Sequence, residues 1–289
     1  MMITIDTALN DFPQQEADEL RRFRAAYSVK RAEIAGVPWD FIEAGRGPET
    51  LLILPGALGV AEMSFQQIRA FENEFRVIVP SYPFSVKTVG ELLTGIRGLL
   101  AAENIEQVHV LGGSYGGMIA QRLVRRYPEL VKNLILSHTG APDPERVEKN
   151  KKFISLMRWL PMGLLRGLLR LVTRKSLEDA GERRDFWMDY SNQITARLSR
   201  QDLISRYQVA VDFDATSSFS PDDLKDWPGR LLILEGDNDP IAEAPARAAL
   251  KAFHPNAKVH TFHGSGHVAS IAKPAEYTAV VTAFLEEKG

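Results

Sequence analysis

The sequence predicts an α/β protein built on a mostly parallel, doubly wound sheet of eight strands. Short apolar runs such as Leu51–Leu54 and Arg76–Val79 are typical of strands that are buried on both faces. Longer segments with helical periodicity lie between the later runs, and Pro128 ends one of them. Because strands that alternate with helices pair in parallel through right-handed crossovers, we expect helices on both faces of the sheet.

The candidate elements follow one another along most of the chain. The expected strands are Glu33–Ala35, Trp39–Glu43, Leu51–Leu54, Arg76–Val79, Val108–Leu111, Leu134–Ser137, Leu231–Glu235 and Val259–Phe262. The expected helices are Glu62–Phe71, Val89–Ala102, Tyr115–Tyr127, Ala244–Ala252 and Pro274–Glu287. The first two strands are joined around Ala35-Gly36-Val37-Pro38, which predicts an antiparallel hairpin at one edge of the sheet.

The alternation of strand and helix breaks once, between residues 141 and 226. This stretch contains no convincing strand, and its helical pieces are rich in Leu, Arg and Trp. A structureless loop of this length is uncommon in a compact domain, so an all-helical insertion is expected. The sequence therefore predicts one core, formed by residues 1–140 and 227–289, that is interrupted by a helical cap.

Composition excludes several classes of protein. None of the 289 residues is cysteine, which rules out a disulfide framework, a thiolate metal site and a cysteine nucleophile. The formal net charge of −2 provides no overall basic field for nucleic acid. The longest stretch without a charged side chain, Gln107–Gln121, is too short and too glycine-rich for a membrane span. The N-terminal MMITIDTALNDF lacks a basic region before an apolar core, so no secretory signal and a cytoplasmic location are expected.

The strongest motif is Gly112-Gly113-Ser114-Tyr115-Gly116, which follows a predicted strand and precedes a predicted helix. This is the context of a nucleophile elbow, a sharp turn that projects a serine hydroxyl above the sheet. Side chains at positions 112 and 116 would collide with the neighbouring strand or helix, so both positions require glycine. The alternative, a phosphate-binding loop, is disfavoured because the segment lacks G-x-G-x-x-G spacing and a G-K-[ST] motif.

A serine nucleophile needs a base that takes its proton and an acid that orients the base. Two later strands end in suitable residues. The strand Leu231–Glu235 runs into a turn that contains Asp237 and Asp239, and the last strand is followed by His263 and His267. The order serine, acid, histidine along the chain is that of α/β-hydrolases.

These motifs resemble the α/β-hydrolase superfamily, and specifically its branch with a helical cap after the sixth strand. The resemblance covers about residues 30–289 in motif order and spacing. It implies that Asp239, three residues after Gly236, is the catalytic acid. It also implies that His267, in Gly264-Ser265-Gly266-His267, is the catalytic base.

Other acids and histidines remain candidates for these roles. Asp237 and Asp143 are alternative acids, and His263 is an alternative base placed four residues early. His109 lies inside a strand and is expected to take part in packing. His138 follows the sixth strand, where it is either a hydrogen-bonded loop residue or a substrate contact. No His and carboxylate spacing suits a metal ion, so neither a metal nor a cofactor is expected.

The oxyanion hole needs two backbone donors. The N–H group of Tyr115, after the nucleophile, is the first expected donor. The resemblance implies that the second is the N–H group of Ala57, in the loop after the third strand. Pro55 replaces the usual histidine of that loop, and Pro80-Ser81-Tyr82-Pro83 replaces the usual Asp-x-Arg-Gly after the fourth strand. Both departures leave the subfamily open.

The predicted cap contains a basic, amphipathic stretch. Residues 149–175 include eight Lys or Arg and no Asp or Glu, and Arg166, Arg170 and Arg174 share one helical face. The expected arrangement packs the opposite, leucine-rich face on the core and leaves the basic face in water. Contact with an anionic membrane surface and attraction of an acidic substrate are the alternatives.

The resemblance and the motifs together predict a serine hydrolase that forms an acyl-enzyme on a small ester or related acyl substrate. Carboxylesterase activity is the first expectation. Lipase, thioesterase, C–C bond hydrolase and cofactor-free peroxidase activities are alternatives on the same fold. A non-catalytic binding or adaptor protein is the alternative from another class, and the oligomeric state stays open.

Overall fold

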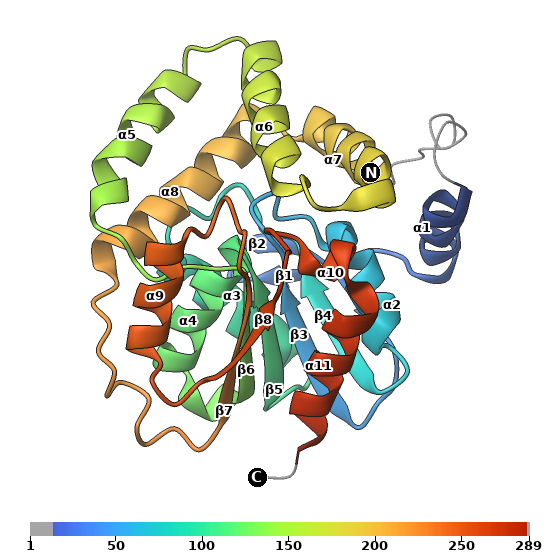
Figure 1. The fold of residues 1–289 in the computed structure, drawn as a ribbon, viewed down its shortest axis with the longest axis vertical. Helices are drawn as coiled ribbons and strands as arrows, with labels where there is room; N and C mark the ends of the chain where they lie inside the picture. The colour runs from blue at the N-terminus through green and yellow to red at the C-terminus, as the bar shows by residue number, and fades with distance from the viewer. Residues whose placement is uncertain (1–13, 288–289) are drawn as a thin grey trace.

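The computed structural model describes residues 14–287 and contains an eight-stranded sheet in the order β1-β2-β4-β3-β5-β6-β7-β8 (Figure 1). β1 pairs with β2 and β2 with β4 in antiparallel fashion, and the other pairs are parallel. This confirms the predicted fold class. The N-terminal segment in which no secretory signal is expected lies outside the described residues. The strands are β1 (Lys30–Ile34), β2 (Val37–Ala44), β3 (Glu49–Leu54), β4 (Phe75–Pro80), β5 (Val108–Gly113), β6 (Val131–Ser137), β7 (Arg230–Gly236) and β8 (Lys258–Phe262).

Helices cover both faces of the sheet because its central strands alternate apolar side chains between two clusters. Leu51 and Ile53 of β3 pack with α2 (Phe65–Phe71) and α11 (Pro274–Glu286). Leu52 and Leu54 pack on the other face with α3 (Val89–Ala102) and α4 (Tyr115–Arg126). The α-helices outside the segment between β6 and β7 are α1 (Gln14–Ala26), α2 (Phe65–Phe71), α3 (Val89–Ala102), α4 (Tyr115–Arg126), α9 (Ala244–Phe253), α10 (Ala269–Ala272) and α11 (Pro274–Glu286). Two short 3₁₀ turns, Ala61–Ser64 and Pro128–Leu130, precede α2 and β6.

The edge hairpin forms as predicted, although its first strand starts earlier. Ile34 of β1 pairs with Val37 of β2, which leaves Ala35 and Gly36 as a two-residue turn. Both turn residues have positive φ angles, 51° and 75°, as a type I′ turn requires. β1 begins at Lys30 rather than Glu33 because the pairing continues to Lys30 opposite Phe41.

Helix α1 is not among the elements predicted from the sequence. Among its described residues, Ala17, Leu20 and Phe23 are the buried apolar side chains, and most of the helix is polar. Arg24 reaches the core through an ion pair with Glu62, with 2.6 Å between Nη2 and Oε1. A stripe this narrow gives a weak periodic signal, and the helix depends on packing against the core.

Between β6 and β7 the chain forms helices and no strand. They are α5 (Glu145–Met157), α6 (Met162–Ser176), the 3₁₀ turn Gly181–Arg183, α7 (Arg184–Arg197) and α8 (Arg200–Thr216). Figure 1 shows them gathered beyond one end of the sheet. An aromatic cluster connects this helical segment to the core: Phe65 of α2 stacks on Trp187 at a centroid distance of 5.4 Å and meets Tyr190 edge-on.

The expected packing of α6 is wrong for much of the helix. Leu165 is the buried leucine of α6, while Leu164, Leu168, Leu171 and Val172 are exposed. Periodicity identifies an apolar face but does not say which partner covers it. Here the neighbouring helices meet the side of α6 that carries Leu165, so the predicted leucine-rich face is only partly used for packing.

Candidate active site

Ser114 occupies a sharp turn between β5 and α4. Its backbone angles are φ 50° and ψ −115°, a conformation that costs a non-glycine residue of order 1–3 kcal/mol. Two hydrogen bonds hold the turn: the N–H of Ser114 donates to the Ser137 carbonyl at 2.8 Å, and Thr139 Oγ1 donates to the Ser114 carbonyl at 2.8 Å. The hydroxyl therefore projects from the carboxyl end of β5 at the N-terminus of α4.

The glycines on either side of Ser114 are required by close backbone contacts. A Cβ atom at Gly112 would lie 2.6 Å from the Gly116 carbonyl oxygen. A Cβ atom at Gly116 would lie 2.0 Å from the Leu54 carbonyl oxygen of β3. The predicted steric reason for both glycines is thus present in the structure.

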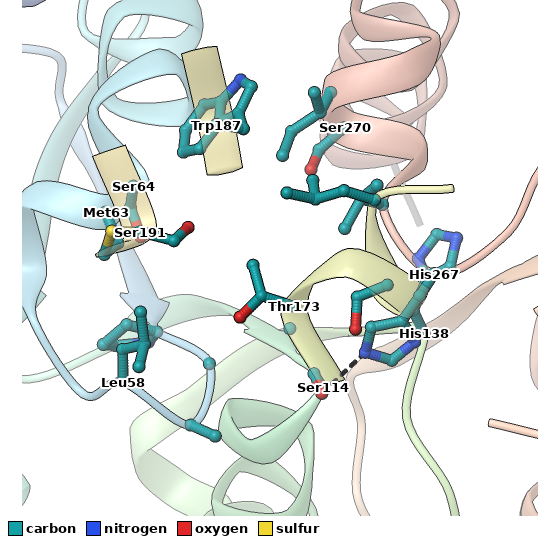
Figure 2. Close-up of a pocket in the computed structure, with 18 of the residues that line it drawn as sticks. Leu58, Met63, Ser64, Ser114, His138, Thr173, Trp187, Ser191, His267 and Ser270 are labelled. Carbon is teal, nitrogen blue, oxygen red and sulfur yellow. Dashed lines mark hydrogen bonds between the residues drawn. The ribbon is translucent and has the colours of Figure 1, made fainter. Parts of the chain in front are cut away.

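The structure brings Ser114, His267 and Asp239 into one hydrogen-bonded line. Ser114 Oγ lies 2.9 Å from His267 Nε2, a contact that is drawn as a dashed line at Ser114 in Figure 2. On the other side of the ring, His267 Nδ1 lies 2.9 Å from Asp239 Oδ2 and 3.0 Å from Oδ1. The three residues follow the carboxyl ends of β5, β7 and β8, which meet at the same edge of the sheet.

Asp239 is buried and held as a carboxylate. Burial alone would raise its pKa, but hydrogen bonds from His267 and from the N–H groups of Ile241 and Ala242 lower the pKa on balance. The two N–H groups donate to Oδ1 at 2.8 and 2.9 Å. A fixed negative charge therefore faces Nδ1 of His267.

The alternative acids have other partners. Asp237 accepts hydrogen bonds from the Gly264 N–H group and contacts His263 Nδ1 at 3.2 Å on the surface. Asp143 accepts a hydrogen bond from the N–H of Glu145 at the start of α5. Neither carboxylate takes the place of Asp239 beside His267.

The alternative histidines are also placed. The side chain of His263 is 87% exposed, away from Ser114. His109 is buried and hydrogen-bonded to Glu49 and Asn133, which agrees with its expected role in packing. His267 is the histidine that contacts Ser114.

Ser114 and His267 line a cavity of about 370 Å³, a volume suited to a small ligand. Its wall combines the loop 54–59, the N-terminal end of α2, and side chains of α6 and α7. Figure 2 shows Leu58, Ser191 and Trp187 on the side of the cavity that faces away from His267. No Lys, Arg, Asp or Glu of the described residues 14–287 lines it. The cavity therefore suits an uncharged, largely apolar molecule.

The two predicted oxyanion donors lie at this end of the sheet. Tyr115 is the first residue of α4, so its N–H group has no acceptor within the helix. Ala57 lines the cavity together with its neighbours Gly56 and Leu58. In residues 14–287, no group of three or more His, Asp or Glu side chains is arranged to hold a metal ion.

The two segments that depart from the family pattern are hydrogen-bonded to each other. The Tyr82 hydroxyl donates to the Pro55 carbonyl at 3.0 Å, and the Tyr82 N–H donates to the Gly59 carbonyl at 2.9 Å. Arg206 of α8 in turn donates to the Tyr82 carbonyl and lies over its ring. Tyr82 and Arg206 thus hold the loop that lacks the usual histidine, a function that sequence motifs did not reveal.

His138 is a buried residue of the cavity wall and has a strained backbone, with φ 49°. Burial, followed by the nearby His267, lowers the pKa of His138 to about 3. Its Nδ1 atom lies 2.9 Å from Ser137 Oγ, whereas its Nε2 atom has no hydrogen-bond partner. The interpretation of His138 as a fully hydrogen-bonded loop residue is therefore wrong.

A chain of side-chain contacts connects Tyr277 to His138. The Tyr277 hydroxyl donates to Ser137 Oγ at 3.1 Å, and Ser137 Oγ lies 2.9 Å from His138 Nδ1. Because its pKa is low, the His138 ring is neutral near pH 7. His138 thus places a neutral imidazole close to His267.

Asp179, which follows α6, contacts the loop that bears His267. Its Oδ2 atom accepts hydrogen bonds from Ser265 Oγ at 2.8 Å and from the Gly266 N–H at 2.6 Å. The contact joins residues 86 and 87 positions apart, and no local motif in the sequence predicts it.

The pKa of His138 predicts a pH-dependent contribution to stability. The ordinary pKa is 6.5, so between pH 6.5 and about 3 the unfolded chain binds a proton that the folded protein does not. Stability from this residue is therefore lost as the pH falls below 6.5. His138→Gln should reduce the pH slope of the free energy of unfolding by up to about 1.4 kcal/mol per pH unit.

Urea denaturation of both proteins between about pH 5 and pH 7 measures this slope. His263→Gln, on the exposed loop, is the matched control. Parallel pH profiles for the protein and its His138→Gln variant would contradict the prediction.

The comparisons with known proteins agree with this architecture. A family model described as "alpha/beta hydrolase fold" matches residues 49–274. A 2-hydroxy-6-oxononadienedioate/2-hydroxy-6-oxononatrienedioate hydrolase of Paraburkholderia phymatum is 27% identical over 267 residues, covering 84% of this chain and 89% of the relative.

Solved structures of different hydrolases share the fold. The enol-lactonase of Burkholderia xenovorans LB400 has a TM-score of 0.75 at 20% identity, with 89% of this chain and 100% of that chain covered. A thermophilic esterase of Thermogutta terrifontis has a TM-score of 0.72 at 20% identity, with 89% and 98% covered. The family match spans well over half of the chain, and the strand order and helix placement agree with it. The chain belongs to the α/β hydrolase fold family.

Proposed function

We propose that this protein is a serine hydrolase that cleaves uncharged and largely apolar acyl substrates, with carboxylesterase activity as the first candidate. The observation that carries this proposal is the hydrogen-bonded line from Ser114 Oγ through His267 to the buried Asp239 at the wall of an uncharged cavity. Relatives and structural neighbours that are named as hydrolases support the reaction class.

In the first step, Ser114 Oγ attacks the substrate carbonyl carbon. His267 Nε2, 2.9 Å away, takes the hydroxyl proton, and the resulting imidazolium is stabilised by Asp239 at Nδ1. The carboxylate also fixes the ring so that Nε2 faces the serine. No other residue of the site is needed for this proton transfer.

The negative charge that develops on the carbonyl oxygen needs donors that are already in place. The N–H groups of Tyr115 and Ala57 fill this role in our proposal, and the α4 dipole favours the same charge. The tetrahedral intermediate then expels the leaving group, which receives the proton from His267. Water, activated by the same histidine, hydrolyses the acyl-enzyme and regenerates Ser114.

The helical segment 141–226 serves as a cap in this proposal. Leu169, Thr173 and Ser176 of α6 and Trp187 and Ser191 of α7 contribute to the cavity wall. These side chains line the same cavity as Ser114, so they are positioned to contact and select the acyl group.

C–C bond hydrolysis is the second candidate, because the compound in the Paraburkholderia relative's name, 2-hydroxy-6-oxononadienedioate, contains no ester or amide bond that a hydrolase could cleave. The name of its substrate, a dioate, denotes two carboxylates. Burying carboxylates without a cationic partner is costly, and no Lys or Arg of residues 14–287 lines this cavity. The lining therefore favours ester or lactone substrates, or neutral ketones, over dicarboxylates.

A fluorophosphonate probe tests the nucleophile. We expect the protein to be labelled and the Ser114→Ala variant to remain unlabelled and to lose esterase turnover by several orders of magnitude, because the attacking oxygen is gone. Ser137→Ala, which removes another hydroxyl of the cavity, is the matched control and should still be labelled. A folded protein that resists labelling, or labelling that survives Ser114→Ala, would reject the proposal.

A substrate panel tests the uncharged lining. Neutral p-nitrophenyl esters of medium-length acids should be turned over with kcat/KM at least 100-fold above esters of the same length that end in a free carboxylate. The comparison uses matched chain lengths, so only the terminal charge differs. Equal kcat/KM for the two series would show that the cavity accommodates anions.

Asp179 is expected to act as a positioning residue for His267. Asp179→Ala removes the acceptor of two hydrogen bonds on the loop before His267, so kcat should fall about tenfold, equivalent to ~1.4 kcal/mol, with little change in KM. Asp179→Asn keeps a carbonyl acceptor and should restore part of kcat. Glu178→Ala, at the exposed neighbouring position, is the control. An equal loss in Glu178→Ala, or a change confined to KM, would contradict this role.

A further inference from the structure

The outer side of helices α5 and α6 is unusually apolar for a surface. Of the ten large hydrophobic side chains exposed in the described part of the chain, six lie between residues 156 and 172. Trp159, in the turn between the helices, is 87% exposed, and Leu164 and Leu171 of α6 are 58% and 62% exposed. A concentration of this kind marks an interaction surface. We call residues 151–175 on this side the α5–α6 surface.

Helix α6 carries apolar residues on two sides. Leu164, Leu168 and Leu171 follow each other at intervals of four and three residues, which places them on one outward stripe. Leu165 and Leu169 belong to the inner side, where Leu169 lines the cavity. The outward stripe is therefore not needed for folding, because the inner side already supplies the packing.

The same surface is strongly cationic. Residues 149–175 contain eight Lys or Arg and no acidic residue. Among them Arg158, Arg170, Arg174 and Lys175 are exposed, and no carboxylate of residues 14–287 lies within ion-pair distance of them. Lys151, in contrast, pairs with Glu148. Unpaired cations beside an exposed apolar stripe favour an occupant that is both apolar and anionic.

An anionic lipid bilayer has both properties. Its acyl boundary accepts leucine side chains, its interface accepts tryptophan, and its anionic headgroups attract Lys and Arg. A second copy of this chain would bring two cationic surfaces together and is therefore disfavoured. In Figure 1 the turn between α5 and α6 is the part of the molecule farthest from the sheet, so it can reach a flat surface without obstruction. No helix of residues 14–287 is long and apolar enough to cross a membrane.

We propose that the α5–α6 surface docks on anionic lipid bilayers, with Trp159 and the stripe Leu164, Leu168 and Leu171 at the acyl boundary. Arg158, Arg170, Arg174 and Lys175 then lie at the level of the headgroups. The cavity shares α6 with this surface through Leu169, Val172 and Thr173. Docking therefore places the cavity wall beside the lipid. The consequence for substrate delivery rests on the proposed function, but the docking itself does not depend on it.

Vesicle binding tests the proposal with the full chain carrying Ser114→Ala, so that no turnover occurs. Sedimentation with phosphatidylcholine vesicles that contain one-third phosphatidylglycerol should yield a partition coefficient at least tenfold above that for pure phosphatidylcholine. Binding should weaken as salt is raised, because headgroup attraction is screened. Equal partition into both vesicle types, or none into either, would overturn the proposal.

Two double variants, each with a matched control, separate the contribution of charge to vesicle binding from that of the apolar stripe. The double variant Arg170→Gln/Arg174→Gln should lower partition into anionic vesicles at least fivefold. Its control, Lys87→Gln/Lys225→Gln, removes the same charge elsewhere on the protein and should leave the partition unchanged. The double variant Leu164→Ser/Leu171→Ser should lower the partition by a similar factor. Its control, Val29→Ser/Val259→Ser, replaces two exposed apolar side chains outside the α5–α6 surface and should leave the partition unchanged. All eight side chains are exposed, so folding is expected to persist and circular dichroism verifies it.

Sedimentation velocity tests the alternative that a second copy of this chain covers the α5–α6 surface. A dimer that dissociates on Leu164→Ser with Leu171→Ser, combined with no preference for anionic vesicles, would assign the surface to a second copy and overturn the proposal. Fluorophosphonate labelling of the wild-type chain is independent of lipid. Failure of docking and failure of the serine hydrolase proposal therefore give different results.

Discussion

The strained turn at Ser114 is the constraint on which the arrangement of the site depends. A serine with φ 50° needs support on both sides, and the central position of β5 in the sheet supplies it. On one side Gly116 fits against the Leu54 carbonyl of β3, and on the other the Ser114 N–H bonds to Ser137 of β6. The loops after β3 and β6 are therefore fixed next to the hydroxyl. They carry Ala57 and His138, so one turn determines which groups surround the reacting atoms.

The loop after β3 shows how the chain tolerates a change at a site residue. Pro55 stands where the resemblance implies a histidine, and Tyr82 holds the loop by hydrogen bonds to the carbonyl groups of Pro55 and Gly59. Arg206 extends the support into α8, where its burial lowers its own pKa. Three segments that are distant in the sequence thereby form one buried unit. The conformation of the loop therefore depends on all three segments together and not on one substituted residue.

Local patterns in the sequence were sufficient for some features and insufficient for others. The turn at Ser114 follows from a short motif whose steric requirements are local. The choice of Asp239 and His267 over Asp237 and His263 came instead from the resemblance to the α/β-hydrolase superfamily. Helix α1 escaped prediction because only three apolar side chains of its described residues, Ala17, Leu20 and Phe23, are buried. The packing of α6 was predicted wrongly because leucines lie on both of its sides. Contacts such as Asp179 with Gly266 join distant segments and leave no periodic signal.

In the proposed function, the contact between Asp179 and the loop before His267 joins the segment that lines the cavity to the residue that takes the serine proton. A Cβ atom at Gly266 would lie 2.9 Å from Asp179 Oδ1, so the two positions constrain each other directly. In the proposed function, replacing the whole segment would exchange the cavity wall and, unless the new segment supplied a carboxylate at the same place, would also remove the acceptor on the loop before His267. Changes to this segment are therefore expected to preserve the carboxylate between α6 and Gly181–Arg183. In that proposal the segment belongs to the framework that holds His267 and is not an independent module.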